Sequence, residues 1–378
     1  MILLNQSKLS RCQMLAATIR LSDAIHTFCH VQVLSSQFCI QSVTESDFPM
    51  SHVLNIAIIG AGLAGISAAR SLASAGHAVT LFDKSRGSGG RLSSKRTDFG
   101  NFDMGAQYFT ARDHGFRQEL KGWLDAGYVE EWSPRVYQYD QSGLRRSTDD
   151  QQRFVGYPRM SAWSRALLEG LELISSTRIE KLQPQADGQW LLVDDQNQEY
   201  GAFDRVIVAT PAPQAAPLLE PASQLAHAAR QVEMLPGWTL ALSFSEPLDT
   251  QVEACFVREG PLDWISRNSS KPGREQADTW VLQSTPGWAQ MNLETDKADV
   301  SQGLLSAFAE VLGMDLPPAQ FSHLHRWLYA RPGQQCEWGA LAAPELGLYA
   351  CGDWCLGGRV ENAWLSGQQA AKTLMSKH

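Results

Sequence analysis

Hydrophobic residues change their spacing between Ile56 and Phe82. Ile56–Ile59 form a short, unbroken apolar run, which is typical of a buried strand. An Ala-rich stretch follows and predicts a helix. A second apolar run, Ala78–Phe82, then ends at the acidic Asp83. This succession predicts a strand–helix–strand unit of the kind that builds a parallel sheet.

Later parts of the chain alternate between helical and strand patterns. Helices are predicted near Phe116–Leu124, at Met160–Leu168, near Val300–Leu312 and from 359–361 onward. Strands are predicted around Trp132 and Tyr137, at Gln189–Asp194, Glu199–Asp204, 205–210, Thr239–Phe244, Cys255–Val257, Trp280–Gln283 and 347–351. The pattern predicts an α/β chain with a parallel sheet and a second, antiparallel sheet.

Three glycines mark the turn between the first apolar run and the helix. Gly60 suits a tight turn, Gly62 lets the backbone reach a pyrophosphate, and Gly65 lets helix and strand pack closely. The helix start presents free N–H groups and the positive end of the helix dipole to phosphates. Asp83, at the end of the second strand, is placed to accept hydrogen bonds from a ribose diol. The sequence therefore predicts a dinucleotide-binding site.

A second glycine-rich turn distinguishes between dinucleotides. Gly89-Gly90-Arg91 follows Asp83 closely and resembles the fingerprint of the FAD-binding amine oxidase superfamily. Three later segments resemble the same superfamily in the same order: Asp103-Met-Gly-Ala-Gln-Tyr-Phe, Ala209-Thr-Pro, and Gly352-Asp353 ahead of a helix. The resemblance implies a Rossmann-like FAD-binding domain of the amine-oxidase (GR2) type, interleaved with an antiparallel-sheet substrate domain.

The motif and the resemblance together imply a set of FAD contacts. Arg91 would reach the pyrophosphate, and Asp353 the ribityl–phosphate region. The small residues Gly105 and Ala106 would let the backbone approach the flavin ring, while the helix start would face the flavin N1/O2 edge. The implied cofactor-binding residues are Gly60, Gly62, Leu63, Ala64, Gly65, Asp83, Lys84, Gly90, Arg91, Gly105, Ala106, Gln107, Tyr108, Ile179, Thr210, Gly352, Asp353, Arg359, Val360 and Glu361.

The resemblance also implies domain limits. The FAD-binding domain is expected at 50–112, 158–213 and 338–378, and the substrate domain at 113–157 and 214–337. Residues 1–49 differ from the rest, with cysteines and no glycine. We expect Met50 to be the true start, with 1–49 a miscalled extension or a disordered tail; a targeting peptide is the alternative, although acidic residues argue against it.

Composition narrows the range of possible binding partners. The net charge of −8 argues against nucleic acid and anionic membranes, and no apolar run is long enough to cross a bilayer. No two cysteines have C-x-x-C spacing, so we expect buried thiols in a reducing cytoplasm and no metal site. Cys336 does not match the segment that attaches flavin covalently in some relatives, so noncovalent FAD is expected.

Four segments resemble one branch of the superfamily, the bacterial renalases: 82–91, 103–112, His325-Arg-Trp-Leu-Tyr-Ala-Arg-Pro332 and 351–361. That resemblance implies oxidation of dihydronicotinamide dinucleotides with hydride on C2 or C6, giving NAD(P)⁺, with O₂ or a quinone as acceptor. Amine oxidases of this fold carry a lysine near flavin N5, which the matching segment 237–244 lacks. A dihydropyridine is already a hydride donor and needs only positioning.

Substrate-positioning candidates come from the aromatic and basic residues. Trp264, Trp327, Tyr329 and Trp354 are placed to stack on a nicotinamide or to wall the flavin, and Arg326 and Arg331 to meet phosphates. His323 and His325 are interpreted as structural because no third metal ligand accompanies them. Two alternatives stay open: an FAD-dependent amine oxidase or desaturase acting on a small apolar substrate, and a non-catalytic flavoprotein.

Overall fold

The computed structural model describes residues 28–34, 37–43, 52–274 and 277–376. The chain divides into two units, Met1–His52 and Val53–His378. In the first unit, β1 (Phe28–Leu34) and β2 (Gln37–Val43) pair as an antiparallel hairpin. The predicted start at Met50 and the remaining residues of the predicted tail lie outside the described residues, so both stay predictions.

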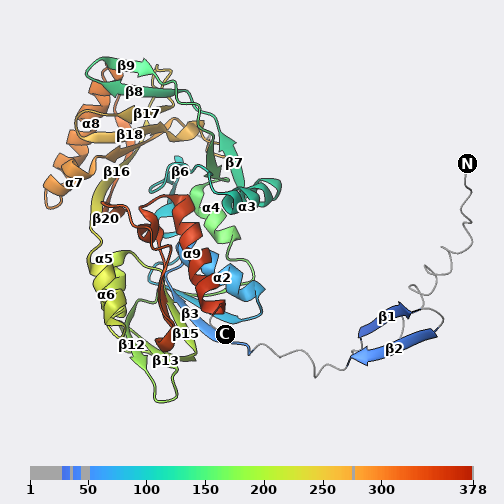
Figure 1. Cartoon of the computed structure of the whole chain (residues 1–378). Helices are drawn as coiled ribbons and strands as arrows, with labels where there is room; N and C mark the ends of the chain where they lie inside the picture. Colours follow the sequence, from blue (N-terminus) through green and yellow to red (C-terminus); the bar gives the residue numbers. More distant parts are fainter. Residues whose placement is uncertain (1–27, 35–36, 44–51, 275–276, 377–378) are drawn as a thin grey trace, which may run out of the picture. The chain divides into compact units, whose positions relative to one another are not determined.

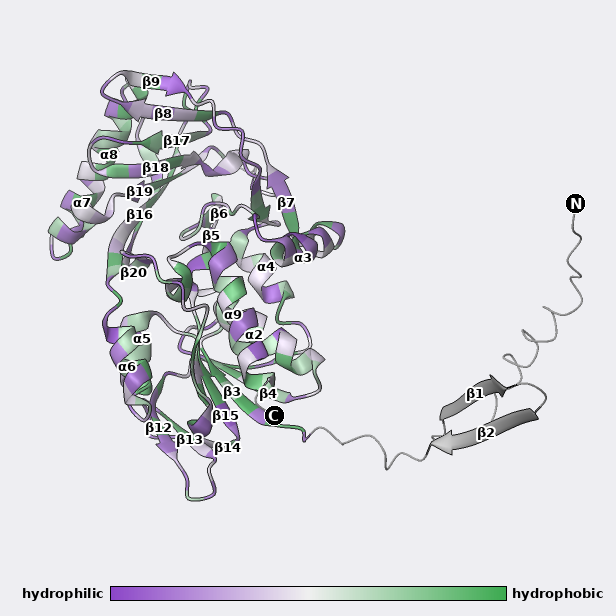
Figure 2. Ribbon diagram, viewed as in Figure 1, coloured by the Kyte–Doolittle hydropathy of each residue, from purple (hydrophilic) through white to green (hydrophobic). Residues whose placement is uncertain are grey.

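A six-stranded sheet forms the base of the second unit (Figure 1). Its order is β11 (Glu172–Ser175), β4 (Ala78–Asp83), β3 (Asn55–Ile59), β15 (Arg205–Val208), β22 (Leu348–Ala350) and β21 (Leu341–Ala343). All neighbours are parallel except β21 and β22. Strands β3 and β15 lie in the middle and are hydrophobic after their first residues, Asn55 and Arg205 (Figure 2), as expected for strands covered on both faces.

Two helices far apart in sequence pack on one another beside this sheet. They are α2 (Leu63–Ser74), the predicted helix after the glycine turn, and α9 (Val360–Met375). The Ser67 hydroxyl donates to the carbonyl of Trp364 at 2.9 Å. A Cβ added at Gly367 would lie 2.1 Å from the carbonyl oxygen of Ala64, so glycine is required for this approach. Helix α9 therefore holds the start of α2, which follows the first glycine-rich turn.

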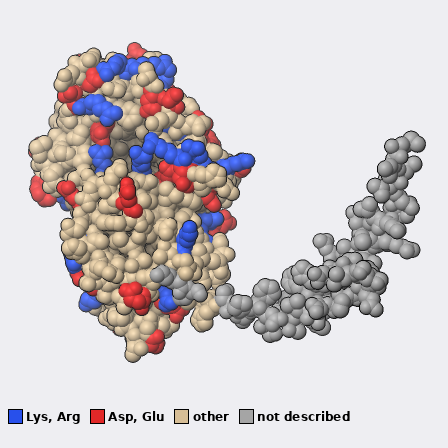
Figure 3. Space-filling model, viewed as in Figure 1, with Lys and Arg blue, Asp and Glu red and all other residues tan. Residues whose placement is uncertain are grey.

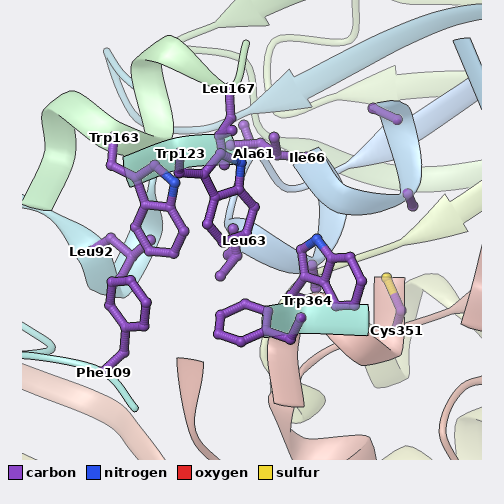
Figure 4. Packing of buried hydrophobic residues seen from close by; sticks show 14 of the residues in the cluster. Ala61, Leu63, Ile66, Leu92, Phe109, Trp123, Trp163, Leu167, Cys351 and Trp364 are labelled. Atoms are coloured by element: carbon purple, nitrogen blue, oxygen red, sulfur yellow. The ribbon is translucent and has the colours of Figure 1, made fainter. Parts of the chain in front are cut away.

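Aromatic rings fill the core on the α2 side (Figure 4). The rings of Phe109 and Trp163 stack with centroids 4.7 Å apart, and Trp123 meets Trp163 edge-on at 5.0 Å. These rings come from the segment after β6 (Gly100–Asp103), from α4 (Met160–Ala166) and from α3 (His114–Asp125). They pack against Leu63 and its neighbours, which fixes the position of the α2 start.

The other helices and strands of this part cover the sheet and its edges. They are α5 (Ala212–Leu218), α6 (Ser223–Arg230), the three-stranded sheet β12 (Ile179–Pro184), β13 (Trp190–Asp194) and β14 (Glu199–Phe203), and the two-stranded pairs β5 (Ser94–Thr97) with β6 (Gly100–Asp103) and β7 (Val129–Trp132) with β10 (Arg153–Gly156).

A seven-stranded sheet forms the opposite end of the second unit. Its order is β20 (Ala319–Pro332), β16 (Met234–Phe244), β19 (Thr279–Ser284), β18 (Leu262–Arg267), β17 (Ala254–Val257), β8 (Val136–Asp140) and β9 (Gly143–Arg146). Only β17 and β8 are parallel neighbours. Helices α7 (Pro286–Met291) and α8 (Lys297–Leu312) cover one face (Figure 1). Strand β20 is the edge strand nearest the six-stranded sheet.

The predicted α/β class is confirmed, although the structure contains helices and strands that were not predicted, and two strands show why. Strand β16 begins at Met234, ahead of the predicted Thr239, because a register shift between Leu235 and Gly237 accommodates the intervening proline. The full length of β20 was not predicted, because an exposed edge strand carries mixed residues instead of an apolar run. In the described part of the chain, no helix is both long and apolar enough to span a bilayer.

Candidate flavin and substrate site

The two glycine-rich turns lie side by side at the start of α2. The backbone N–H of Gly89 donates to the carbonyl of Ala61 at 2.8 Å, and Gly62 and Gly89 form a parallel bridge. Gly62 is the N-cap of α2 and supplies no side-chain cap, and the first turn contains no acidic residue. The first N–H groups of the helix are therefore left for a ligand, as a phosphate site requires.

At each glycine of the first turn, an added Cβ would meet different surroundings. Gly60 has φ +112°, and a Cβ there would lie 2.8 Å from the carbonyl oxygen of Ala209. A Cβ at Gly65 would lie 2.0 Å from the carbonyl oxygen of Gly60. At Gly62, by contrast, a Cβ meets nothing within 4 Å. The turn is packed on the protein side and open on the side where a pyrophosphate would lie, so these residues fit a dinucleotide.

Asp83 is held at the end of β4 by two backbone groups. Its Oδ2 accepts the N–H of Ala61 at 2.8 Å, and its Oδ1 accepts that of Ser85 at 2.7 Å. Each oxygen keeps a further lone pair for a ribose hydroxyl. The carbonyl of Asp83 accepts the N–H of Thr177 at 2.9 Å, which brings the start of β12 and Ile179 to the same end of the sheet. The exposed Lys84 lies next along the chain.

Arg91 and Asp353 contact each other directly. The Arg91 guanidinium donates to Oδ2 of Asp353 at 3.0 Å and to Oδ1 at 2.6 Å. A third bond, at 3.3 Å, reaches the carbonyl of Ala330 on β20. From the sequence, these two side chains were expected to contact different parts of FAD. The structure joins the second glycine turn to the Gly352-Asp353 motif through this ion pair.

The Gly105 segment, residues 104–109, packs directly against Arg91. A Cβ at Gly105 would lie 1.9 Å from the carbonyl oxygen of Arg91, which also accepts the N–H of Ala106 at 2.9 Å. Two side chains of the seven-stranded sheet reach this segment: Gln283 Nε2 donates to Gly105 O at 2.7 Å, and Trp327 Nε1 to Met104 O at 2.9 Å. The segment is therefore the junction between the two sheets.

The start of α9 is strained and uncapped. Arg359 is an exposed non-glycine residue at φ +102° and ψ 154°, a region that almost only glycine adopts. No side chain caps the helix. The carboxylate of Glu361 is buried and accepts the N–H groups of Arg112 and Asp113 at 2.6 and 2.7 Å. Any contact of Val360 or Glu361 with a flavin edge would therefore use backbone N–H groups, not this carboxylate.

Thr210 and Trp354 meet beneath the Gly352 motif. The indole N–H of Trp354 donates to the carbonyl of Thr210 at 3.0 Å, and the Trp354 side chain is fully buried. It therefore presents no face to a substrate, and its suggested stacking role is not supported by its position. The Thr210 hydroxyl oxygen is buried without a hydrogen-bond partner among the described residues, which leaves it free for a cofactor.

An aromatic wall lies on the substrate-domain side, next to Gln107. The rings of Tyr108 and Trp264 lie 5.2 Å apart, and Phe256 meets Trp264 edge-on at 4.8 Å. The Arg153 guanidinium lies 5.1 Å from the centre of the Tyr108 ring. The buried indole N–H of Trp264 has no partner among the described residues.

Strand β20 separates Arg326 from the aromatic residues. Arg326 is on the opposite face from Trp327 and donates to the carbonyl of Leu293 at 2.7 Å, beyond α7. Arg331 pairs with Asp263 at 3.1 Å. Neither arginine lies free beside Trp327, so the expected Arg326–Arg331 cluster is split. Tyr329 follows Trp327 by one alternation of the strand.

A fully buried charge cluster escaped the sequence interpretation. Asp103 Oδ2 accepts from Arg274 at 2.8 Å and from Lys271 at 3.3 Å, and all three side chains are fully buried. Lys271 also donates to Gln107 Oε1 at 2.9 Å. Burial lowers the pKa of Lys271 to about 8, with Asp103 opposing this effect. Burial alone would raise the pKa of Asp103, but Arg274 and Lys271 hold it below its usual value.

Nothing in the sequence signals this burial, because lysine and arginine are mostly exposed in proteins. A weaker hint was the position of Asp103 directly before the Gly105 segment. In the described part of the chain, His, Cys, Asp and Glu side chains do not gather in threes as a metal site would require.

The parallel sheet and the glycine turns define a Rossmann-type nucleotide-binding fold. Residues 58–123 match the NAD(P)-binding Rossmann-like domain family, and residues 121–375 match the family described as flavin containing amine oxidoreductase. The second match spans more than half of the chain. The chain belongs to the flavin-containing amine oxidoreductase family, and its cofactor is a flavin.

Individual relatives match the chain either over a short stretch or at low sequence identity. A 4,4'-diapophytoene desaturase of Staphylococcus aureus strain Newman is 48% identical over 52 residues, 14% of this chain and 10% of that protein. Cyclohexylamine oxidase from Brevibacterium oxydans IH-35A superposes with a TM-score of 0.70 at 13% identity, covering 86% of this chain and 99% of that one. A putative protoporphyrinogen oxidase from Exiguobacterium sp. 255-15 superposes with a TM-score of 0.69 at 13% sequence identity, covering 87% of this chain and 100% of that one. These similarities show the shared fold alone.

Proposed function

We propose that this flavoprotein binds FAD noncovalently and oxidises dihydronicotinamide dinucleotides that carry hydride on C2 or C6, returning NAD(P)⁺, with O₂ or a quinone as electron acceptor. The observation that carries the proposal is the aromatic lining at the Gly105 segment: Trp327, fixed by its bond to Met104 O, and the Tyr108–Trp264 pair. Flat rings of this kind suit a flat nicotinamide ring.

The proposed reaction asks little chemistry of the protein side chains. Bound FAD supplies N5, the atom that accepts the hydride. Gln283 and Trp327 hold the Gly105 segment through its carbonyls, so the wall facing the substrate is rigid. The chain contributes positioning and exclusion of water, which are the needs of a substrate that is already a hydride donor.

Noncovalent binding is supported by the state of the cysteines. Burial raises the pKa of Cys255 and of Cys351 to about 12. Such thiols stay protonated, whereas the thiolate is the nucleophile. We expect acid precipitation to release free FAD into the supernatant. Flavin that stays with the precipitated chain would contradict noncovalent binding.

Amine oxidation is the second candidate, because the family and the cyclohexylamine oxidase fold point to it. Two observations weigh against it. Strand β16 contains no lysine, and the two carboxylates that raise the pKa of Tyr108, Asp149 and Asp263, are paired with Arg153 and Arg331. An ammonium substrate at the wall would therefore compete with these arginines for the carboxylates.

Anaerobic stopped-flow mixing distinguishes the candidates. We expect rapid flavin bleaching by 2-dihydro- or 6-dihydro-NAD(P), and little by ordinary NAD(P)H, cyclohexylamine or putrescine. Faster bleaching by an amine would replace the proposal with amine oxidation, and bleaching by none of them would favour a non-catalytic flavoprotein or a different substrate.

A pair of tryptophan variants tests the wall itself. Trp327→Phe keeps a ring but removes the bond to Met104 O, so flavin reduction should slow while FAD stays bound. Trp288→Phe, on α7, is the matched control and should leave the rate unchanged. Equal rates in both variants would remove Trp327 from the proposed site.

A further inference from the structure

One face of β20 carries a row of rings that leads away from the Gly105 segment. His323, His325 and Trp327 alternate along the strand, and their register against β16 is regular over this stretch. The rings of His325 and Trp327 meet edge-on, with centroids 4.4 Å apart. Because Trp327 is fixed at Met104 O, the two imidazoles lie progressively farther from the predicted flavin.

The β5–β6 hairpin brings a lysine to the same place. Lys95 pairs with Phe102 across the hairpin, so the two side chains share a face. The Phe102 ring stacks on Phe321 of β20, with centroids 5.1 Å apart. Phe321 is one alternation before His323, so Lys95 reaches the face of β20 that carries the histidines.

Lys297, at the start of α8, approaches β20 from the other face of the seven-stranded sheet, because α8 packs on the side of Leu324. It therefore reaches the histidine row only around the free edge of β20. Burial lowers the pKa of both His323 and His325, and the positive charges of Lys95 and Lys297 lower both pKa values further, as His323 does for His325.

Two carboxylates that lie near Lys297 in the sequence make other contacts. Asp296 accepts the N–H of Ala298 as the cap of α8, and Glu294 pairs with Arg326. In the part of the chain that the structure describes, neither Lys95 nor Lys297 forms an ion pair. Figure 3 shows a hollow on one face of the molecule, with both basic and acidic side chains around it.

We propose that Lys95, Lys297, His323 and His325, the basic patch, bind the phosphate groups of the dinucleotide substrate. The inference rests on the proposed function and names the part of the protein that would hold the anionic end of its substrate. Like charges gathered without a counter-ion cost free energy, and a bound anion removes that cost. Lysine donates charge-assisted hydrogen bonds to phosphate oxygens, and a neutral imidazole still donates one N–H.

The position of the basic patch suits a ligand with a flat ring at one end. His325 and His323 follow Trp327 at roughly 7 and 13 Å along the strand, at about 3.3 Å per residue. A dinucleotide carries its nicotinamide ring and its phosphates on opposite sides of a ribose, so one molecule reaches both the ring row and the basic patch. This assigns phosphate binding to residues other than Arg326 and Arg331.

Calorimetric titration of the FAD-loaded protein tests the proposal with NAD⁺, ADP and nicotinamide riboside. Lys95→Gln/Lys297→Gln should weaken NAD⁺ and ADP about 10-fold or more, because two charged hydrogen bonds are lost. Nicotinamide riboside, which lacks phosphate, should bind as before. The salt dependence of NAD⁺ binding should also flatten, since fewer ionic contacts remain to be screened.

Lys121→Gln/Lys372→Gln is the matched control, because both lysines are exposed and outside the basic patch. Its NAD⁺ affinity should equal that of the parent, and FAD content should be equal in all three proteins. Equal NAD⁺ and ADP affinities in parent and basic-patch variant, or no NAD⁺ and ADP binding to the parent, overturn the basic patch. If the parent binds both ligands through the patch but no dihydro isomer bleaches the flavin, the proposed function fails while the patch stands. If isomers bleach parent and basic-patch variant at equal rates and at equal half-saturating concentrations, the patch fails while the function stands.

Discussion

Arg91 and Asp353 are 262 residues apart in the chain and form a two-armed ion pair, with nitrogen–oxygen distances of 3.0 and 2.6 Å. The Asp353 side chain is 9% exposed and that of Arg91 29%. The two planar groups match in shape, so each orients the other. Two motifs that nucleotide-binding proteins of this kind carry at opposite ends of the domain are thus fixed at one point.

Asp353→Ala should weaken FAD retention. The change leaves the Arg91 guanidinium without its partner and removes an acceptor from a buried site, which costs about 1–3 kcal/mol. FAD content after extensive dialysis, measured by absorbance against protein concentration, reports the loss. Asp263→Ala, which breaks a more exposed pair with Arg331, serves as the control. FAD content equal to that of the parent would remove Asp353 from the site.

Alanine at two glycines of the first turn should affect two different properties, FAD affinity in one case and stability in the other. Gly62→Ala adds a Cβ into open space, so we expect the apoprotein to keep its melting temperature but to bind FAD more weakly. Gly65→Ala forces a Cβ to 2.0 Å from Gly60 O and should lower stability itself. Thermal unfolding of FAD-free protein, followed by FAD titration, separates the two. Undiminished FAD affinity in Gly62→Ala would place the pyrophosphate elsewhere.

Asp103→Asn should be far more damaging than Asp263→Asn. The first leaves two fully buried cations without a counter-ion and should cost about 3–5 kcal/mol of unfolding free energy. The second removes one carboxylate of a pair whose side chains are 51% and 34% exposed and should cost about 0–1 kcal/mol. Urea denaturation gives both values. Similar losses in the two variants would contradict the importance assigned to the buried cluster.

The pH dependence of stability should change in Lys271→Met. Burial lowers the pKa of Lys271 to about 8 in the folded protein, whereas it returns to about 10.4 in the unfolded chain. Between these values the unfolded chain holds a proton that the folded protein has released, so stability increases with pH. The unfolding free energy of the parent, relative to Lys271→Met, should therefore rise from about pH 8 to about pH 10.4. A flat or falling difference across this range would show that Lys271 titrates normally.

The sequence predicted the parts of this fold that depend on local patterns. Ile56–Ile59 are buried, and the second run ends in the buried Leu81 and Phe82, so both apolar runs are unambiguous, and the glycines between them follow from backbone geometry. Segments that are expected to contact the cofactor, such as those of Gly105 and Asp353, were identified from motifs, and both lie against Arg91 in the structure.

The remaining features depend on tertiary contacts that no local pattern carries. The burial of Lys271 and Arg274 depends on Asp103, which lies far away in sequence, and lysine or arginine in a loop predicts exposure. Strand β20 is an exposed edge whose residues serve two different faces, so its polar and aromatic positions show no simple period. The separation of Arg326 from Trp327 follows from strand alternation, which becomes visible only when the strand is known.

The close packing of α2 against α9 affects how this protein is made. On the ribosome, residues 63–74 emerge long before residues 360–375, so the small-residue face around Ala64 and Ser67 has no helix to cover it for most of synthesis. The nascent chain must carry this strip uncovered or shielded by a chaperone. A premature stop codon within the last helix would leave it open permanently, and such products are expected to be recognised by proteases rather than to persist as partly active enzyme.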